Sequence, residues 1–293
     1  MTERARARVI AAALPPSRLV IVGHPVAHSL SPVFQSAALR AAGILVSYDR
    51  EDVAPDRLSD ALERLAAEGA GGNITIPHKE AAAMLFGRCT PVAARVGAVN
   101  TFWTEHGALV GHNTDVDGAV ATIRALLPSS QGEPRDSSIV VLGAGGSAAA
   151  VLVALHDLGL HHITVVARTP LRAQALSERL HIPVRVVASD AAVKAVRSAS
   201  LLINATPVGM HDDAFPVPVE ALPAQCAVFD LVYRAGLTPW IAACRKAGLR
   251  AEDGLRMLVE QGAAAFESWF DVPAPREAMW HALRAVPPAH GRS

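Results

Sequence analysis

Four short polar segments, each at the end of an apolar run, carry side chains that could bind a ligand or move a proton. They are "HSLSP" (28–32), "NITIPHK" (73–79), "AVNT" (98–101) and "HNTD" (112–115). Lys79 could donate a proton to a reacting group, or it could be the first solvated charge of a helix. Ser31 and Asp115 could equally be helix caps, and Asn73 and Asn100 could be turn residues. Taken singly, none of the segments decides between these interpretations.

The segment "IVVLGAGGSAAAVLVAL" (139–155) combines a β-branched strand, a glycine-rich turn and an apolar helix. Its turn matches G-x-G-x-x-[G/A] in the strand–turn–helix context of dinucleotide binding, although a bare tight turn is the alternative. A glycine permits the turn, a second lets the backbone approach a pyrophosphate, and the helix N-terminus attracts the phosphates. The residues predicted to contact the cofactor are Gly143, Ala144, Gly145, Gly146, Ser147 and Ala148.

The next predicted strand favours NADP over NAD. NAD sites carry an acidic residue at the end of this strand, where it bonds the ribose 2′-hydroxyl. Here the strand ends in "VVARTPLR" (165–172), with no carboxylate and with two arginines around Thr169. Guanidinium groups bind a 2′-phosphate through charge-assisted hydrogen bonds. Ala167, Arg168, Thr169 and Arg172 are therefore predicted cofactor residues, although Arg172 could be a solvated helix residue.

Two further strand ends are predicted to form the walls of a nicotinamide site, because ligands of open α/β sheets lie outside the carboxyl ends of the strands. They are "LLINATPVGM" (201–210), which contributes Thr206, Val208 and Met210, and "AVFDLVY" (227–233). Ordinary structural turns are the alternative for both segments.

The elements that must position these residues alternate between strand and helix. In the first half, strands are predicted at 18–23, 44–49 and 73–76, and helices at 31–43, 55–69, 77–87 and 115–127. A hairpin is expected around Glu105–Gly107. After a Pro- and Ser-rich linker (128–138), six strands separated by helical stretches predict a parallel, doubly wound sheet. Two helices without a following strand end the chain.

The composition limits the classes of function. The 293 residues favour two domains, and 51% hydrophobic against 18% charged residues indicates a globular chain. Basic and acidic residues number 27 each, which removes the usual electrostatic mark of a nucleic-acid binder. No apolar run approaches the roughly 20 residues of a membrane span, and the three cysteines lack disulfide or metal-site spacing. We expect a cytoplasmic enzyme without a metal, either a monomer or a homodimer, that acts on a small molecule.

Together these segments resemble the shikimate dehydrogenase family over essentially the whole chain. The matching motifs are "SLSP", "GNITIPHK", "GAVNT", "GHNTD", "GAGGSA", "ART", "NATPVGM", "DLVY" and "DG..MLVEQGA..F..W". The resemblance implies the reversible, NADP-linked interconversion of 3-dehydroshikimate and shikimate, in chorismate and aromatic amino-acid biosynthesis. It also implies an α/β fold with a discontinuous substrate domain (1–115 and 256–293), a Rossmann-type NADP domain (116–255), and C-terminal helices that pack back on the substrate domain.

The resemblance further implies roles for single positions. Ser29 and Ser31 match a pair that holds the substrate carboxylate, and Lys79 and Asp115 match the catalytic pair. These types suit the reaction, because hydride delivery to a carbonyl builds an alkoxide that an ammonium can stabilise and protonate. Positions that match other substrate-contacting groups are Asn73, Thr75, Asn100, Tyr233 and Gln261. Leu231 and Gly254 match positions at the nicotinamide end.

Some positions depart from the family pattern and keep alternatives open. Gln35-Ser36 stands where His-Asn is frequent, and "ART" replaces the commoner "NRT". A paralogue acting on quinate or an aminoshikimate is the nearest alternative, although Ser31 and Arg168 favour shikimate with NADP. A non-catalytic NADPH-binding sensor on the same scaffold is the alternative of another class. Such a sensor would have little reason to keep Lys79, Asp115 and both serines.

Overall fold

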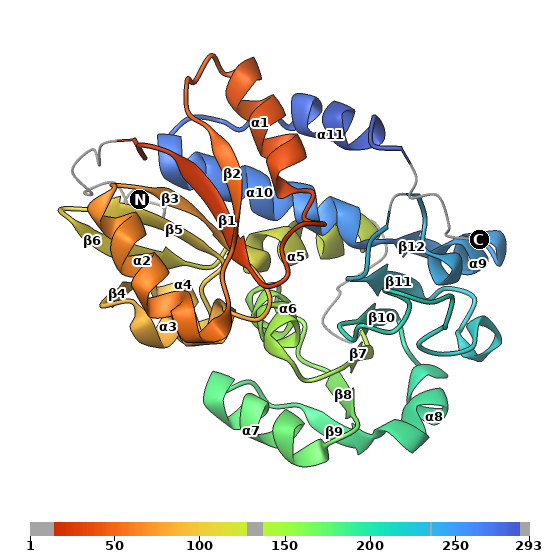
Figure 1. The fold of residues 1–293 in the computed structure, drawn as a ribbon. Helices are drawn as coiled ribbons and strands as arrows, with labels where there is room; N and C mark the ends of the chain where they lie inside the picture. The colour runs from red at the N-terminus through yellow and green to blue at the C-terminus, as the bar shows by residue number, and fades with distance from the viewer. Residues whose placement is uncertain (1–14, 128–136, 235, 288–293) are drawn as a thin grey trace, which may run out of the picture.

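The computed structural model of the protein describes residues 15–127, 137–234 and 236–287. The N-terminal extension and most of the predicted linker lie outside these residues. Two six-stranded sheets form the framework. Helices α5 (Asp115–Leu126), α6 (Gly146–Asp157) and α10 (Gly254–Phe270) lie between the two sheets (Figure 1).

The second sheet is parallel throughout, as predicted. Its strands are β7 (Ile139–Leu142), β8 (Ile163–Ala167), β9 (Arg185–Ala188), β10 (Leu201–Asn204), β11 (Ala227–Asp230) and β12 (Arg250–Glu252). They are arranged in the order β12-β11-β10-β7-β8-β9, which is that of a doubly wound dinucleotide-binding sheet. Its other helices are α7 (Pro170–Leu180), α8 (Ala192–Val196) and α9 (Pro239–Lys246). The order reverses between β7 and β10, where ligands of such sheets bind.

The first sheet is mixed. Its strands are β1 (Leu19–Gly23), β2 (Tyr48–Asp52), β3 (Gly71–Ile74), β4 (Arg88–Cys89), β5 (Thr101–Glu105) and β6 (Ala108–His112), in the order β2-β1-β3-β5-β6-β4. Strand β5 is antiparallel to both β3 and β6, whereas the remaining pairs are parallel. The helices between these strands are α1 (Ser31–Ala41), α2 (Leu58–Ala67), α3 (Lys79–Leu85) and α4 (Pro91–Val96). Helix α2 buries Leu58, Leu62 and Leu65, which share one face at helical spacing.

The predicted hairpin is confirmed. Strands β5 and β6 pair with Glu105 opposite Ala108, and His106 and Gly107 connect them. Both connecting residues have positive φ angles, 52° and 78°. Two positive φ angles are the mark of a type I′ turn, whose twist matches that of the flanking strands.

The strand predicted at 44–49 begins later than expected. β2 spans Tyr48–Asp52, and only Tyr48 in it is buried. Ile44 and Val46 pack on the core from irregular chain, and Leu45 is exposed. β2 is an edge strand, where charged side chains discourage pairing with another chain. Its sequence, "YDRED", therefore lacks the apolar alternation by which a strand is recognised.

Three other boundaries differ slightly from the prediction. β3 begins at Gly71 rather than at 73. Its Gly72 passes so close to β1 that a Cβ there would lie 1.9 Å from the Val20 carbonyl oxygen, so this strand position requires glycine. Helix α3 begins at Lys79 rather than at 77, with His78 at the N-cap. Helix α1 begins at Ser31 as predicted but ends at Ala41 rather than at 43, and its N-cap is Leu30 rather than Ser31. Lys79 and Ser31 are thus the first residues of their helices.

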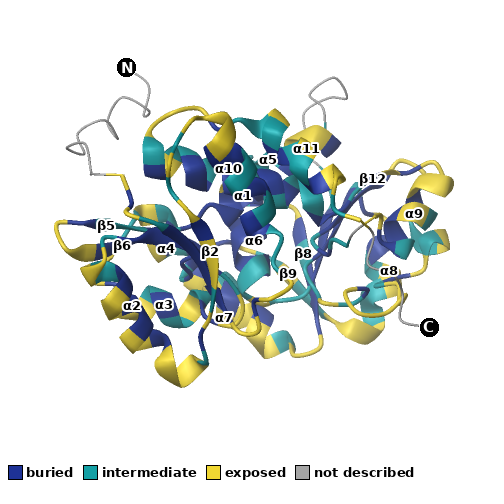
Figure 2. Ribbon diagram, turned by 45° about the horizontal axis from the view of Figure 1, so that its top comes forward, coloured by how far each residue is buried: buried dark blue, intermediate teal, exposed yellow. Residues whose placement is uncertain are grey.

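The two C-terminal helices pack back against the first sheet's side of the molecule, as predicted. Helix α10 contacts α5 and α1, and α11 (Arg276–Arg284) contacts α1. Phe34 of α1 and Phe266 of α10 are fully buried in the core that they share. Figure 2 shows strands buried in both sheets, whereas outer helices such as α2 expose one face. Among the described residues, no helix combines the length and the apolar character that a membrane crossing requires.

Candidate active site

A cavity of about 520 Å³ lies between the two sheets, at the carboxyl ends of their strands. Four helices contribute their first residue to its lining, and α6 contributes its second: Ser31, Lys79, Asp115, Gly254 and Ser147. The first N–H groups of a helix have no partner within the helix, and the dipole is positive at this end. The N-termini of α1 and α6 have no acidic residue in their first turn, so these two ends suit anionic ligands.

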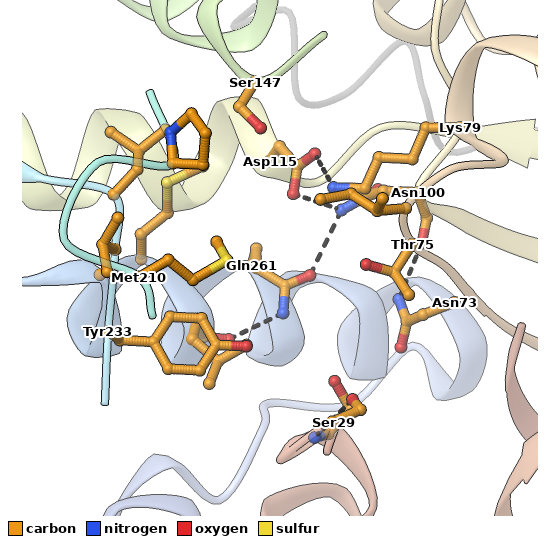
Figure 3. A pocket seen from close by; sticks show the side chains of 18 of the residues that line it. Ser29, Asn73, Thr75, Lys79, Asn100, Asp115, Ser147, Met210, Tyr233 and Gln261 are labelled. Atoms are coloured by element: carbon orange, nitrogen blue, oxygen red, sulfur yellow. Dashed lines mark hydrogen bonds and ion pairs between the residues drawn. The ribbon is translucent and has the colours of Figure 1, made fainter. Parts of the chain in front are cut away.

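Lys79 and Asp115 form an ion pair in the cavity wall (Figure 3). Lys79 Nζ lies 2.7 Å from Asp115 Oδ2, and the side chains are 23% and 10% exposed. One ammonium hydrogen bonds to the carboxylate, which leaves two for a ligand. The pair can therefore place an ammonium against an oxygen that gains negative charge, and can supply that oxygen with a proton.

The Asn100 side chain organises the neighbourhood of this pair. Its Oδ1 accepts from Thr114 N at 2.7 Å, and its Nδ2 donates to Asp115 Oδ1 at 2.9 Å. A longer contact, of 3.3 Å, joins Nδ2 to Gln261 Oε1 of α10. Both carboxylate oxygens of Asp115 are thus held, one by Lys79 and one by Asn100. A ligand that bonds to Asn100 Nδ2 would most readily replace its weak contact to Gln261.

At the other end of the cavity, Ser29 and Ser31 lie at the start of α1. Ser31 N donates to Ser29 Oγ at 3.3 Å, and Arg50 Nη2 donates to the Ser29 carbonyl oxygen at 2.7 Å. The arginine therefore fixes the backbone that carries the serine pair. Two hydroxyl groups beside a helix N-terminus form a site for a carboxylate.

The opposite wall comes from the second sheet and from α10. Tyr233 and Met210 follow β11 and β10 and lie across the cavity from Lys79 and Asn73 (Figure 3). Burial raises the pKa of Tyr233, so its phenol stays a hydrogen-bond donor. Gln261 Nε2 donates to the Leu258 carbonyl oxygen at 2.8 Å, which leaves one amide hydrogen for a ligand.

His78, to which the sequence assigned no role, braces the turn before Lys79. The imidazole is buried, and its Nε2 lies 2.7 Å from the Val53 carbonyl oxygen at the end of β2. Asp52, the last residue of β2, bonds through its carboxylate to His24 Nδ1 at 2.6 Å and accepts from Val26 N at 3.2 Å. The end of β2 therefore fixes both the turn that leads to Lys79 and the loop that leads to the serine pair.

The glycine-rich turn fits a dinucleotide. Gly143 has a φ of +104°, and a Cβ there would lie 2.9 Å from the Ala205 carbonyl oxygen, so the turn requires glycine. At Gly145, the N-cap of α6, no described atom lies within 4 Å of a Cβ position, so the backbone is open to a ligand. No described side chain caps α6, and its first turn contains no acidic residue. These are the features of a pyrophosphate cradle.

Arg168 and Arg172 lie at the end of β8 and in the first turn of α7, at the same edge of the sheet as this turn. Both side chains are exposed, and neither forms an ion pair with the described part of the chain. An unpaired guanidinium at this edge is available for the 2′-phosphate of NADP.

A buried carboxyl, Asp230, supports the wall at the ends of β10 and β11. Its Oδ1 accepts from Asn204 Nδ2 at 2.8 Å and from Val232 N at 3.1 Å. Burial raises the pKa of Asp230 to about 6, which outweighs the lowering by its hydrogen bonds, and nearby Asp253 adds to the rise. Asn204 Oδ1 also accepts a hydrogen bond from Thr206 N at 3.0 Å. This network therefore fixes the loop that carries Thr206.

All nine residues predicted for catalysis and substrate binding line the cavity: Ser29, Ser31, Asn73, Thr75, Lys79, Asn100, Asp115, Tyr233 and Gln261. Five predicted cofactor residues line it too: Ser147, Thr206, Met210, Leu231 and Gly254. The others lie outside it, on the turn after β7, around the β8–α7 junction and in the loop after β10: Gly143, Ala144, Gly145, Gly146, Ala148, Ala167, Arg168, Thr169, Arg172 and Val208.

The sequence did not predict several other lining residues. The apolar ones include Ile21, Ile74, Met257 and Leu258, whose types are also those of ordinary core residues. His28 and His211 line the cavity as well. Each is a direct neighbour of a predicted residue, Ser29 or Met210, and this adjacency was the only available sign.

Comparison with known proteins identifies the family. Three family models match the chain: the shikimate dehydrogenase substrate binding domain over residues 21–102, shikimate / quinate 5-dehydrogenase over 126–210, and the shikimate 5′-dehydrogenase C-terminal domain over 254–284. The shikimate dehydrogenase (NADP(+)) of Symbiobacterium thermophilum is 40% identical over 283 residues, which cover 92% of this chain and 95% of that protein. The chain belongs to the shikimate dehydrogenase family.

Solved structures of family members share the fold. Shikimate 5-dehydrogenase from Thermus thermophilus, in complex with NADP(H) and shikimate, has a TM-score of 0.81 and 39% identity, covering 91% of this chain and 98% of that one. Quinate dehydrogenase from Corynebacterium glutamicum, in complex with NAD, has a TM-score of 0.82 and 30% identity, covering 92% and 99%. Both activities therefore occur on this fold.

The raised pKa of Asp230 predicts a pH-dependent contribution to stability. Between about pH 4 and 6 the native carboxyl holds a proton that the unfolded chain has released, so stability falls as the pH rises through this window. Relative to Asp230→Asn, wild type should lose about 1–3 kcal/mol of unfolding free energy between pH 4.5 and 7. Urea unfolding of both proteins across this range measures the difference. The exposed Asp190→Asn serves as the control, and parallel profiles for wild type and Asp230→Asn would contradict the assignment.

Proposed function

We propose that the protein is an NADP-dependent shikimate dehydrogenase, which reversibly reduces 3-dehydroshikimate to shikimate. The observation that carries this proposal is the convergence of Lys79, Asp115 and the serine pair on one cavity beside a dinucleotide turn. Membership of the family and the NADP-linked activity of the Symbiobacterium relative support it. By the same reasoning, residues 1–115 and 256–293 form the substrate domain, and 116–255 form the NADP domain.

The substrate is an anionic, polyhydroxylated ring, and the two ends of the cavity suit its two ends. Ser29 and Ser31 would hold the carboxylate at the N-terminus of α1. Thr75, Gln261 and Tyr233 would bond to the ring hydroxyls, since each retains a donor that faces the cavity. With the carboxylate held at one end, the reacting carbonyl would lie at the other, beside Lys79.

The glycine-rich turn would hold the pyrophosphate, and Arg168 would hold the 2′-phosphate. When bound, NADPH supplies the hydride for the carbonyl carbon. As the carbonyl oxygen gains negative charge, the Lys79 ammonium stabilises it and donates a proton. Asp115 keeps the ammonium in place through the 2.7 Å contact, and in the reverse direction the pair accepts the hydroxyl proton.

Quinate oxidation with NAD is the second candidate function, because a quinate dehydrogenase bound to NAD shares the fold at 30% identity. Arg168 argues against NAD as the preferred cofactor, since NAD sites place a carboxylate at that strand end. Ser31, rather than a bulkier residue at the carboxylate site, argues for shikimate.

A steady-state comparison of shikimate and quinate, each with NADP and NAD, tests the function. Absorbance of the reduced cofactor gives kcat/KM for the four combinations. We expect shikimate with NADP to exceed the other three by about tenfold or more, a difference of about 1.4 kcal/mol in transition-state stabilisation. A tenfold preference for quinate with NAD would overturn the assignment. The absence of any shikimate-dependent reduction of NADP would instead favour a non-catalytic cofactor sensor.

Arg168→Ala tests the cofactor assignment separately. Loss of a charge-assisted contact to the 2′-phosphate should raise the Kd for NADP by about tenfold or more. The Kd for NAD, which has no such phosphate, should change little. Isothermal titration of both dinucleotides measures the two constants, and Arg185→Ala, an exposed arginine on the neighbouring β9, is the matched control. Equal losses for both dinucleotides would contradict the role of Arg168.

A further inference from the structure

Tyr48 does not line the cavity, but it contacts Asn73, which does. It is the first residue of β2, and its side chain is buried. The hydroxyl lies 2.6 Å from Asn73 Oδ1. The ring packs against Trp269 of α10, with a centroid separation of 6.1 Å, and Trp269 Nε1 in turn donates to the Phe102 carbonyl oxygen at 3.0 Å. The ring contact with the anchored Trp269 thus fixes the position of the phenol.

The hydrogen bonds around Asn73 determine which way its amide points. One partner, 3.0 Å from Nδ2, is the Asn100 carbonyl oxygen, which can only accept. A second partner, also at 3.0 Å, is Thr101 Oγ1. Rotating the amide by 180° would place two acceptors against each other, so Oδ1 must face Tyr48. Tyr48 is therefore the donor to Asn73, and both hydrogens of the amide are already used.

This arrangement leaves the Asn73 side chain with one free hydrogen-bonding position. Its Oδ1 has one lone pair beyond the bond from Tyr48, and the residue lines the cavity. Asn73 can therefore accept a hydrogen bond from a ligand but cannot donate one. The phenol that maintains this state stays protonated, because burial raises the pKa of Tyr48 and the nearby Ser31 hydroxyl and Arg50 lower it only in part.

We propose that Tyr48 is a positioning residue that sets specificity: it holds Asn73 as a pure acceptor, so that the site selects a ligand hydroxyl at this position. The proposal rests on the proposed function, because the ligand is taken to be a polyhydroxylated ring acid. A ketone or ether oxygen placed there would face Asn73 Oδ1, so that two acceptors would meet in a buried contact without a hydrogen between them. Such a mismatch costs more than the loss of a neutral contact.

A double-mutant cycle tests this role. Tyr48→Phe removes only the hydroxyl and keeps the packing against Trp269. We expect it to raise the Kd and KM for shikimate by about tenfold, with kcat and the Kd for NADPH within about twofold of wild type. In the Asn73→Ala background the same change should alter the shikimate Kd by less than about twofold, because Tyr48 would have no amide to position.

The control is Thr122→Val, which removes another buried hydroxyl, 2.9 Å from the Gly118 carbonyl oxygen, in the interior of α5. It should lower stability without changing the shikimate Kd. An equal loss of affinity from Tyr48→Phe in both backgrounds would make Tyr48 merely structural and overturn the proposal, as would no loss in either. If wild type binds NADPH but not shikimate, the proposed function fails instead, and the two failures are distinct.

A ligand series tests the proposal without altering Tyr48. Shikimate analogues that each lack one ring hydroxyl are compared on wild type and on Asn73→Ala. One analogue should lose about tenfold in affinity on wild type and much less on the variant, because its missing hydroxyl is the donor to Asn73. Uniform losses on both proteins would overturn the acceptor role. This comparison holds even if Tyr48→Phe does not fold.

Discussion

The ion pair between Lys79 and Asp115 is the interaction on which the rest of the site depends. Two opposite charges that are mostly buried require compensating hydrogen bonds, because desolvation costs several kcal/mol per ion. Asn100 Nδ2 supplies one such bond to the Asp115 carboxylate, and Asn113 Oδ1 fixes the backbone there by accepting from Asp115 N at 3.1 Å. Asn100 directly precedes β5, and Asp115 follows β6 after Asn113 and Thr114. Asn100 N donates to the His112 carbonyl oxygen. The β5–β6 hairpin therefore brings Asp115 and its support Asn100 together, so the antiparallel part of the first sheet holds one half of the proposed catalytic pair.

The two sheets contribute different chemistry to one cavity. The first sheet and its helices supply groups that suit a hydroxylated acid, and the parallel sheet supplies a glycine turn and arginines that suit a dinucleotide. Helix N-termini are common to both halves, and this explains why a chain with equal numbers of acidic and basic residues suits two anionic ligands. Backbone dipoles do not appear in a count of charged side chains, and they add to the positive potential of Lys79 and the arginines. Helix α10 joins the halves, because it begins at Gly254 beside the second sheet and carries Gln261 to Asn100.

Sequence reasoning succeeded where one local physical rule applied. Glycine and proline punctuation with apolar periodicity placed all six strands of the parallel sheet, and the rule of strand carboxyl ends placed the candidate residues together. It failed where an element carries no periodicity of its own: β2 is a charged edge strand, and β4 has two residues and α4 six. It could not assign His78 or Tyr48, because each acts through a contact to a segment distant in sequence, at Val53 and Asn73 respectively. Such contacts are tertiary, so spacing along one segment does not encode them.

In the proposed mechanism, the Lys79 ammonium donates and accepts the proton while other groups hold the ligands. The most direct measurement is kcat for shikimate oxidation by Lys79→Met, together with the Kd values for shikimate and NADP. Loss of the charged donor should lower kcat by about a hundredfold or more, in the range for a general acid that also stabilises developing charge. Both Kd values should stay within about fivefold, since the serine pair and the glycine turn remain. An unchanged kcat, or a loss confined to shikimate binding, would contradict the account.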